Sequence, residues 1–166
     1  MEHSAGHGGA DRAPVDARAE SEPASWDAAA ALVRADDDRA EADRVRGRNR
    51  YQGVPTLEPD ARIGPLLTVD ERVVAVRRGA TFERRQPATG TLVPTGIAGD
   101  FYVTSRRLVL VGRLTLSFDL SQVEQALLSG ERILVVMRDG MGFALEVEQP
   151  RLLRVEIAAA RACATG

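Results

Sequence analysis

GDFYVTSRRLVLVG, the stretch from Gly99 to Gly112, has the pattern of two β-strands joined by a short polar turn. Phe101 and Val103 alternate with Tyr and Thr, which is the two-residue period of a strand. The polar run 105–107 then interrupts the apolar residues, which resume before Gly112. The stretch therefore predicts a β-hairpin.

More strands are predicted before this hairpin. Val73–Val76 reads as a strand, and Thr81–Arg85 reads as a second strand or as the continuation of the first. The choice depends on Gly79, which makes either a turn or a β-bulge. The run Gln86–Gly99 contains three Gly and two Pro, so we expect a loop there.

The strand pattern continues after the hairpin. Apolar and polar residues alternate in 114–118, whereas 121–128 has no decisive period and is either a short strand or a helical turn. Ile133–Met137 and Phe143–Val147 read as two strands. Asp139-Gly140 lies between them and predicts a hairpin with a two-residue type I′ turn.

A helix and a polar N-terminal region complete the prediction. Pro150 can occupy the first turn of a closing helix whose inward face carries Leu153, Ile157 and Ala160. The fold class is mainly β: an antiparallel sandwich or barrel of about seven strands, capped by this C-terminal helix. The predicted parts are a disordered tail (1–24), a polar helix (25–46), a linker (47–69) and the β domain (70–163).

The segment GDFYVTSRRL, together with the Asp-Gly hairpin and the terminal helix, resembles the bacterial PH-like domains related to the GRAM group. It is most similar to the small PH-like proteins of actinobacteria, and the resemblance covers residues 70–163. The resemblance implies a strongly bent β-barrel, and it implies that Arg107 ties down its turn. It implies no activity, because this fold serves as a platform for lipids or peptides.

Composition excludes several classes of function. The net charge is −2, from 24 acidic against 22 basic residues, and lacks the large positive excess of most nucleic-acid-binding proteins, so no nucleic-acid binding is expected. The longest aliphatic runs are far shorter than a membrane span, and the N-terminus lacks a secretory pattern, which predicts a cytoplasmic protein with no integral membrane segment. We expect no metal and no cofactor: His3 and His7 lie among glycines, and Cys163 is alone.

Two surfaces in the sequence could carry function. Trp26, Leu32 and Val33 form a small apolar stripe on the polar helix, suited to docking on the domain or to holding a partner. The neighbouring run Asp36–Asp38 could suggest a cation site, but consecutive helical residues point in different directions, so we expect a solvated face.

The second surface is a set of four arginines, Arg77, Arg78, Arg106 and Arg107. If Gly79 is a turn, both connections lie at the same end of the sheet and the four form an anion-binding cluster. If Gly79 is a bulge, the cluster does not form. We predict a non-enzymatic binding or scaffolding module that engages an unknown protein partner through the barrel and the N-terminal tail. The alternative is weak peripheral binding to anionic lipid through these arginines.

Overall fold

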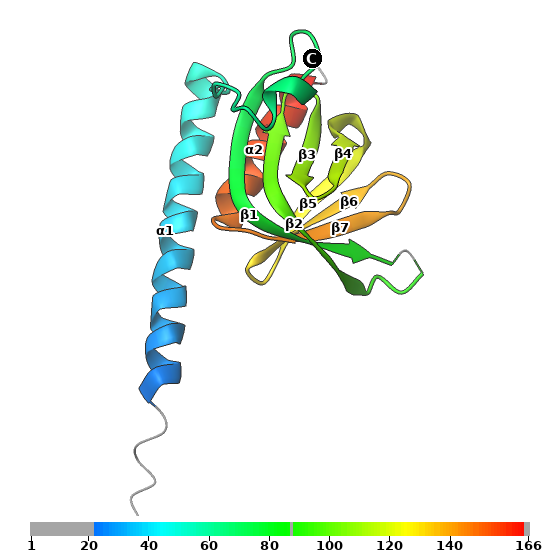
Figure 1. Ribbon diagram of the computed structural model, residues 1–166. Coiled ribbons are helices and arrows are strands. Elements are labelled where there is room, and N and C mark those ends of the chain that lie inside the picture. Colours follow the sequence, from blue (N-terminus) through cyan, green and yellow to red (C-terminus); the bar gives the residue numbers. More distant parts are fainter. Residues whose placement is uncertain (1–21, 87, 165–166) are drawn as a thin grey trace, which may run out of the picture. The chain divides into compact units, whose positions relative to one another are not determined.

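The computed structural model describes residues 22–86 and 88–164 (Figure 1). The chain divides into two compact units, Met1–Val33 and Arg34–Gly166. Helix α1 (Glu22–Gln52) begins in the first unit and ends in the second. The predicted disordered tail falls almost entirely on residues 1–21, outside the described ranges, and so do both histidines.

The second unit contains a seven-stranded antiparallel sheet in the order β4-β3-β2-β1-β7-β6-β5. The order leaves β4 and β5 as unpaired edges, so the predicted seven-stranded bent sheet is present but is not closed by hydrogen bonds. After α1, the second unit contains these elements in chain order: η1 (Gly64–Leu66), β1 (Val73–Arg85), β2 (Leu92–Thr104), β3 (Arg107–Gly112), β4 (Thr115–Asp119), η2 (Leu120–Gln122), β5 (Val123–Ser129), β6 (Arg132–Met137), β7 (Gly142–Glu146) and helix α2 (Pro150–Ala164).

The hairpin of residues 99–112 is confirmed as the pairing of β2 with β3, in register from Gly99 opposite Gly112 to Val103 opposite Leu108. The two glycines allow the strands to approach closely. A Cβ at Gly112 would overlap the backbone oxygen of Ala98, closer than real Cβ contacts come.

Gly79 lies in a β-bulge of a continuous strand. Strand β1 runs from Val73 to Arg85, and its register with β2 shifts between Arg77 and Ala80, where Gly79 takes a φ of +64°. Residues 81–85 therefore continue the first strand. This geometry removes the condition under which the four arginines were predicted to cluster.

The loop predicted over residues 86–99 is wrong, because β2 already begins at Leu92. Residues 92–98 pair with the second half of β1, and the two extra residues Thr95 and Gly96 are accommodated where the register shifts. Proline has no backbone N–H to donate to a neighbouring strand. Pro94 is tolerated because β3 pairs with β2 only from Gly99 onward, so the edge of β2 at Pro94 has no neighbouring strand that needs this donor.

The hairpin between β6 and β7 is confirmed, but its type I′ turn is not. Such a turn needs positive φ at both central residues, and only Gly140 has one, at +80°. The connection is a longer turn in which Gly140 N–H donates to the Met137 carbonyl at 3.0 Å. The Asp139 carboxylate stabilises it by accepting the Met141 N–H at 2.9 Å.

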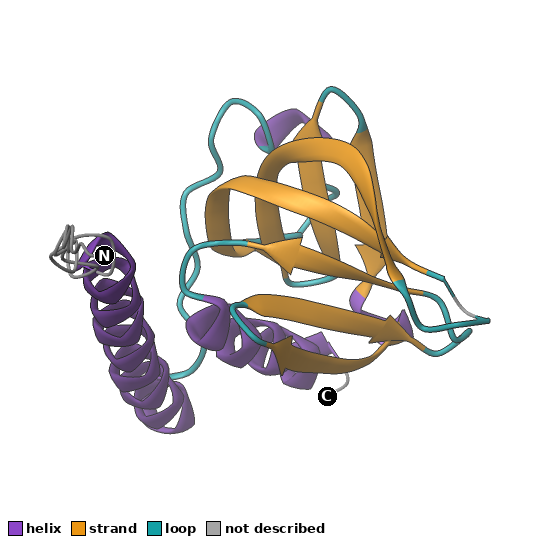
Figure 2. Ribbon diagram, turned by 90° about the horizontal axis from the view of Figure 1, so that it is seen from below, coloured by secondary structure: helices purple, strands orange, loops and turns teal. Residues whose placement is uncertain are grey.

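The main core fills the concave side of the bent sheet, and α2 packs across its open end (Figures 1 and 2). Leu153, Ile157 and Ala160 of α2 are buried there, as the helical spacing predicted. Phe82, Phe118 and Phe143 also pack together in this core, with ring centroids 4.4 to 6.1 Å apart.

Candidate functional site

The arginines at the β1 bulge are engaged by carboxylates. Arg77 is mostly buried and its Nη2 lies 2.6 Å from Oε2 of Glu156 on α2. Arg78 donates to Asp100 at 2.6 Å and to Asp60 at 2.7 Å. Both guanidinium groups are therefore neutralised within the fold.

The other two predicted anion-binding residues lie at the β2–β3 turn. Arg107 contacts the buried Glu71 carboxylate through Nε at 2.9 Å, and Arg106 reaches the Thr68 hydroxyl at 3.3 Å. Val73, at the start of β1, pairs with Thr104 beside this turn, whereas Arg77 pairs with Phe101 farther along the strand. The structure does not bring the four arginines together.

Glu71 is the centre of a buried polar cluster under this turn. Its side chain is 1% exposed and accepts hydrogen bonds from Thr68, Thr104 and Arg107 at 2.7 to 3.1 Å. Burial alone would raise the pKa of this carboxyl, but those donors outweigh it and lower the pKa to about 2. The cluster holds the turn in place.

The predicted docking residues belong to the first unit and are open to solvent. Trp26 is 74% exposed, Leu32 68% and Val33 61%. We call these three residues the Trp26 stripe.

Within the second unit, residues 34–52 of α1 pack against α2. Ala42 and Val45 bury Leu152 and Val155 in a separate apolar cluster. This packing keeps the chain helical as far as Gln52 rather than to residue 46, and Gly53, with a φ of +77°, then ends the helix.

The interpretation of Asp36–Asp38 as a wholly solvated face is wrong for Asp38. Its carboxylate is buried and accepts the backbone N–H groups of Arg151 and Leu152 at 2.8 and 2.9 Å. Those groups are in the first turn of α2, where helical N–H donors have no partner within the helix. Asp38 thus caps the neighbouring helix and fixes the two helices against each other.

A groove of about 630 Å³ lies between these two helices and the edge strand β5. Its floor consists of small apolar side chains, because α2 turns three alanines toward it: Ala158, Ala159 and Ala162. Ala126 of β5 and Val54 extend this floor. A solvent-facing helix surface usually carries charged residues, so a run of alanines there leaves an apolar trough.

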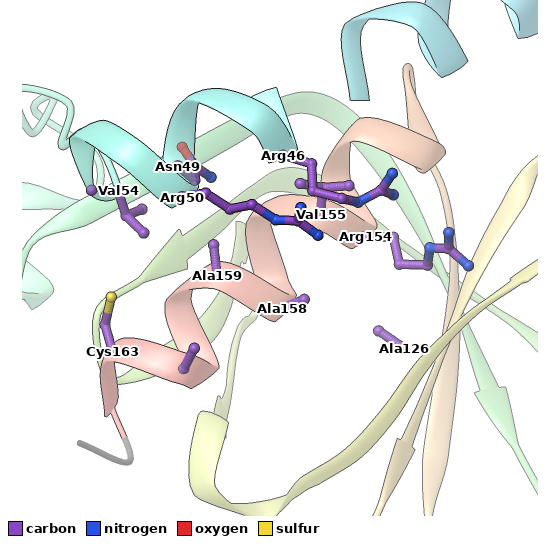
Figure 3. Close-up of a pocket in the computed structure, with 12 residues that line it drawn as sticks. Arg46, Asn49, Arg50, Val54, Ala126, Arg154, Val155, Ala158, Ala159 and Cys163 are labelled. Atoms are coloured by element: carbon purple, nitrogen blue, oxygen red, sulfur yellow. The ribbon is translucent and has the colours of Figure 1, made fainter. Parts of the chain in front are cut away.

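Three arginines stand at one end of the groove. Arg46 and Arg50 extend from α1 and Arg154 from α2, and their guanidinium groups gather away from Val54 and Cys163, which lie at the other end (Figure 3). We call this site the arginine groove. Arg46 pairs with Asp43, but among the described residues no acidic side chain pairs with Arg50 or Arg154.

Asn49 also lines the arginine groove and has a side-chain atom without a hydrogen-bond partner among the described residues. Its side-chain oxygen Oδ1 is buried and accepts no hydrogen bond from the described residues. Buried acceptors are nearly always satisfied in folded proteins.

The sequence prediction missed the arginine groove. The helical spacing assigned Ile157 and Ala160 to the core-facing side and gave the two alanines between them no role, yet Ala158 is exposed, Ala159 is half-buried, and both line the groove. One signal was available: the alanines of α2 continue around the helix, beyond the face occupied by Leu153 and Ile157. The arginines of α1 carry no such signal, since most residues around them are also charged.

The chain matches no protein-family model, and no curated protein matches it. Of residues 22–164 that the structure describes, no helix is both long and apolar enough to span a membrane. The same residues include no group of three His, Cys, Asp or Glu side chains placed to hold a metal ion.

Proposed function

We propose that the protein is a non-enzymatic binding module of PH-like fold that holds an acidic, amphipathic segment of a partner protein in the arginine groove. The observation that carries this proposal is the pair of guanidinium groups of Arg50 and Arg154, which have no acidic partner among the described residues and lie beside an apolar floor. Guanidinium groups bind carboxylates with charge-assisted, often bidentate hydrogen bonds.

The apolar floor of the arginine groove favours a peptide as its ligand. Alanine side chains leave room for apolar side chains of a partner, and the volume is within the range of about 300 to 1,000 Å³ typical of ligand sites. A ligand with an acid at one end and apolar groups at the other matches the separation of Arg154 from Val54 and Cys163 (Figure 3). A cytoplasmic location and the PH-like and GRAM-related resemblance are parts of the same proposal.

Lipid binding through Arg77, Arg78, Arg106 and Arg107 is less favoured. Three of these residues already bind carboxylates of the same fold. A lipid headgroup would have to displace those carboxylates, some of which are buried.

The proposal is tested by selecting random phage-displayed peptides on the immobilised full chain. Selected peptides are then measured by fluorescence anisotropy against the wild type and the double variant Arg50→Glu/Arg154→Glu. The matched control, Arg113→Glu/Arg138→Glu, makes the same charge change at exposed residues that do not line the groove.

We expect peptides with Asp or Glu beside apolar residues, and a loss of at least about tenfold in affinity in the groove variant, equivalent to about 1.4 kcal/mol. The control variant should stay within about twofold of wild type. Peptides that bind both variants equally, or no enrichment of acidic peptides, would contradict the proposal. Sedimentation of the chain with phosphatidylserine vesicles but not with neutral ones, unchanged in the groove variant, would favour lipid binding instead.

A further inference from the structure

The Trp26 stripe leaves large apolar side chains in water. Trp26, Leu32 and Val33 are each more than 60% exposed, and Trp26 and Val33 are seven residues apart, which places them on one face of the helix. Large apolar side chains gathered on a surface commonly mark an interaction site. Tryptophan is also one of the residue types enriched among the side chains that carry most of the binding energy of an interface.

The sequence around the stripe is acidic. Residues 22–37 contain four acids, Glu22, Asp27, Asp36 and Asp37, against one base, Arg34, so their net charge is −3. This segment combines an apolar face with negative charge. Residues 22–37 therefore combine acidic and apolar side chains, as we propose for the ligand of the arginine groove.

We infer that the Trp26 stripe of one copy of the chain docks in the arginine groove of a second copy. This inference rests on the proposed function, because it names the occupant of the same groove. The apolar side chains of the stripe would cover the alanine floor, and Asp36 and Asp37 would lie near Arg50 and Arg154. Each copy carries one stripe and one groove, so the contact can close as a symmetric pair or continue from copy to copy.

The test is sedimentation velocity of the full chain over a range of concentrations, with two charge-reversed variants. The groove variant is Arg50→Glu/Arg154→Glu, and the stripe variant is Asp36→Arg/Asp37→Arg. Both change exposed or half-buried side chains, and neither touches the capping residue Asp38.

We expect the wild type to associate as concentration rises, and each variant alone to lose that association by at least about tenfold. An equimolar mixture of the two variants should recover it, because each reversed surface then meets its complement. Recovery cannot come from misfolding of either variant. Trp26→Ala should weaken association by at least about tenfold without changing the charge.

A wild type that stays monomeric at all concentrations would overturn the inference, and so would association that both variants retain. The phage-selected peptides separate this failure from failure of the proposed function. If the wild type stays monomeric while acidic peptides bind the full chain and lose affinity for the groove variant, the groove has another occupant and only self-association is refuted. If no acidic peptide binds the full chain either, the groove proposal itself is wrong.

Discussion

Replacement of Glu71 by Gln tests whether one buried carboxylate holds the β2–β3 turn. The pKa of Glu71 falls from an ordinary 4.5 to about 2, although burial alone would raise it, because Arg107, Thr68 and Thr104 donate to the charged form. One pKa unit corresponds to about 1.4 kcal/mol, so we expect Glu71→Gln to lower the free energy of unfolding at pH 7 by about 3 kcal/mol.

The sign of the pH dependence follows from the lowered pKa. The folded state favours the ionised carboxyl, so the stabilisation is complete above pH 4.5 and is lost as pH falls towards about 2. The glutamine has no such titration. The difference in unfolding free energy between wild type and Glu71→Gln should therefore shrink steadily over that range.

Urea unfolding followed by circular dichroism at several pH values from 7 to 2.5 measures this difference. Other acids titrate in both proteins and cancel in the comparison. The control is Glu146→Gln, an exposed strand residue, for which we expect a change below about 0.5 kcal/mol. A Glu71→Gln effect that is under about 1 kcal/mol, or that does not depend on pH, would refute this account of the cluster.

Three further predictions follow from the same structure and use the same unfolding measurement. Asp38→Ala removes the cap of α2 and should cost about 1 to 2 kcal/mol; no loss would show that the cap is dispensable. Gly112→Ala should destabilise, because its Cβ would meet the Ala98 carbonyl, whereas Gly47→Ala, in open space within α1, should stabilise by about 1 kcal/mol; equal effects would contradict this contrast. Arg77→Met should lower the free energy of unfolding by about 3 to 5 kcal/mol, because it leaves the Glu156 carboxylate unpaired. Adding Glu156→Leu should recover most of this loss, and a single variant as stable as wild type would contradict the prediction.

Local patterns in the sequence were sufficient for most of the fold. The alternation around Phe101, the helical spacing of Leu153 and Ile157, and the Asp-Gly pair each depend on neighbours within a few residues, and all three elements are present. Most strand pairs in the sheet also join neighbours along the chain, and the pairing of β1 with β7 is the exception.

Errors arose where a partner outside the local sequence pattern decided the structure. Residues 92–98 looked like a loop because of their glycines and prolines, yet the second half of β1 provides a strand to pair with. Asp38 looked solvated because the N–H groups that it caps are 113 and 114 residues away. Composition cannot reveal such a partner.

The arginines show the same limit and explain why the candidate site moved. Sequence alone does not show which of the 22 basic residues pair with an acid, whereas the structure pairs Arg78 with Asp100, 22 residues away, and Arg77 with Glu156, 79 residues away. An arginine that already binds a carboxylate of its own fold is a weak candidate for a ligand, since binding must first break that pair. In a chain this rich in arginine, a binding site is therefore best sought where guanidinium groups have no acidic partner among the described residues and lie beside apolar surface, as Arg50 and Arg154 do in the arginine groove.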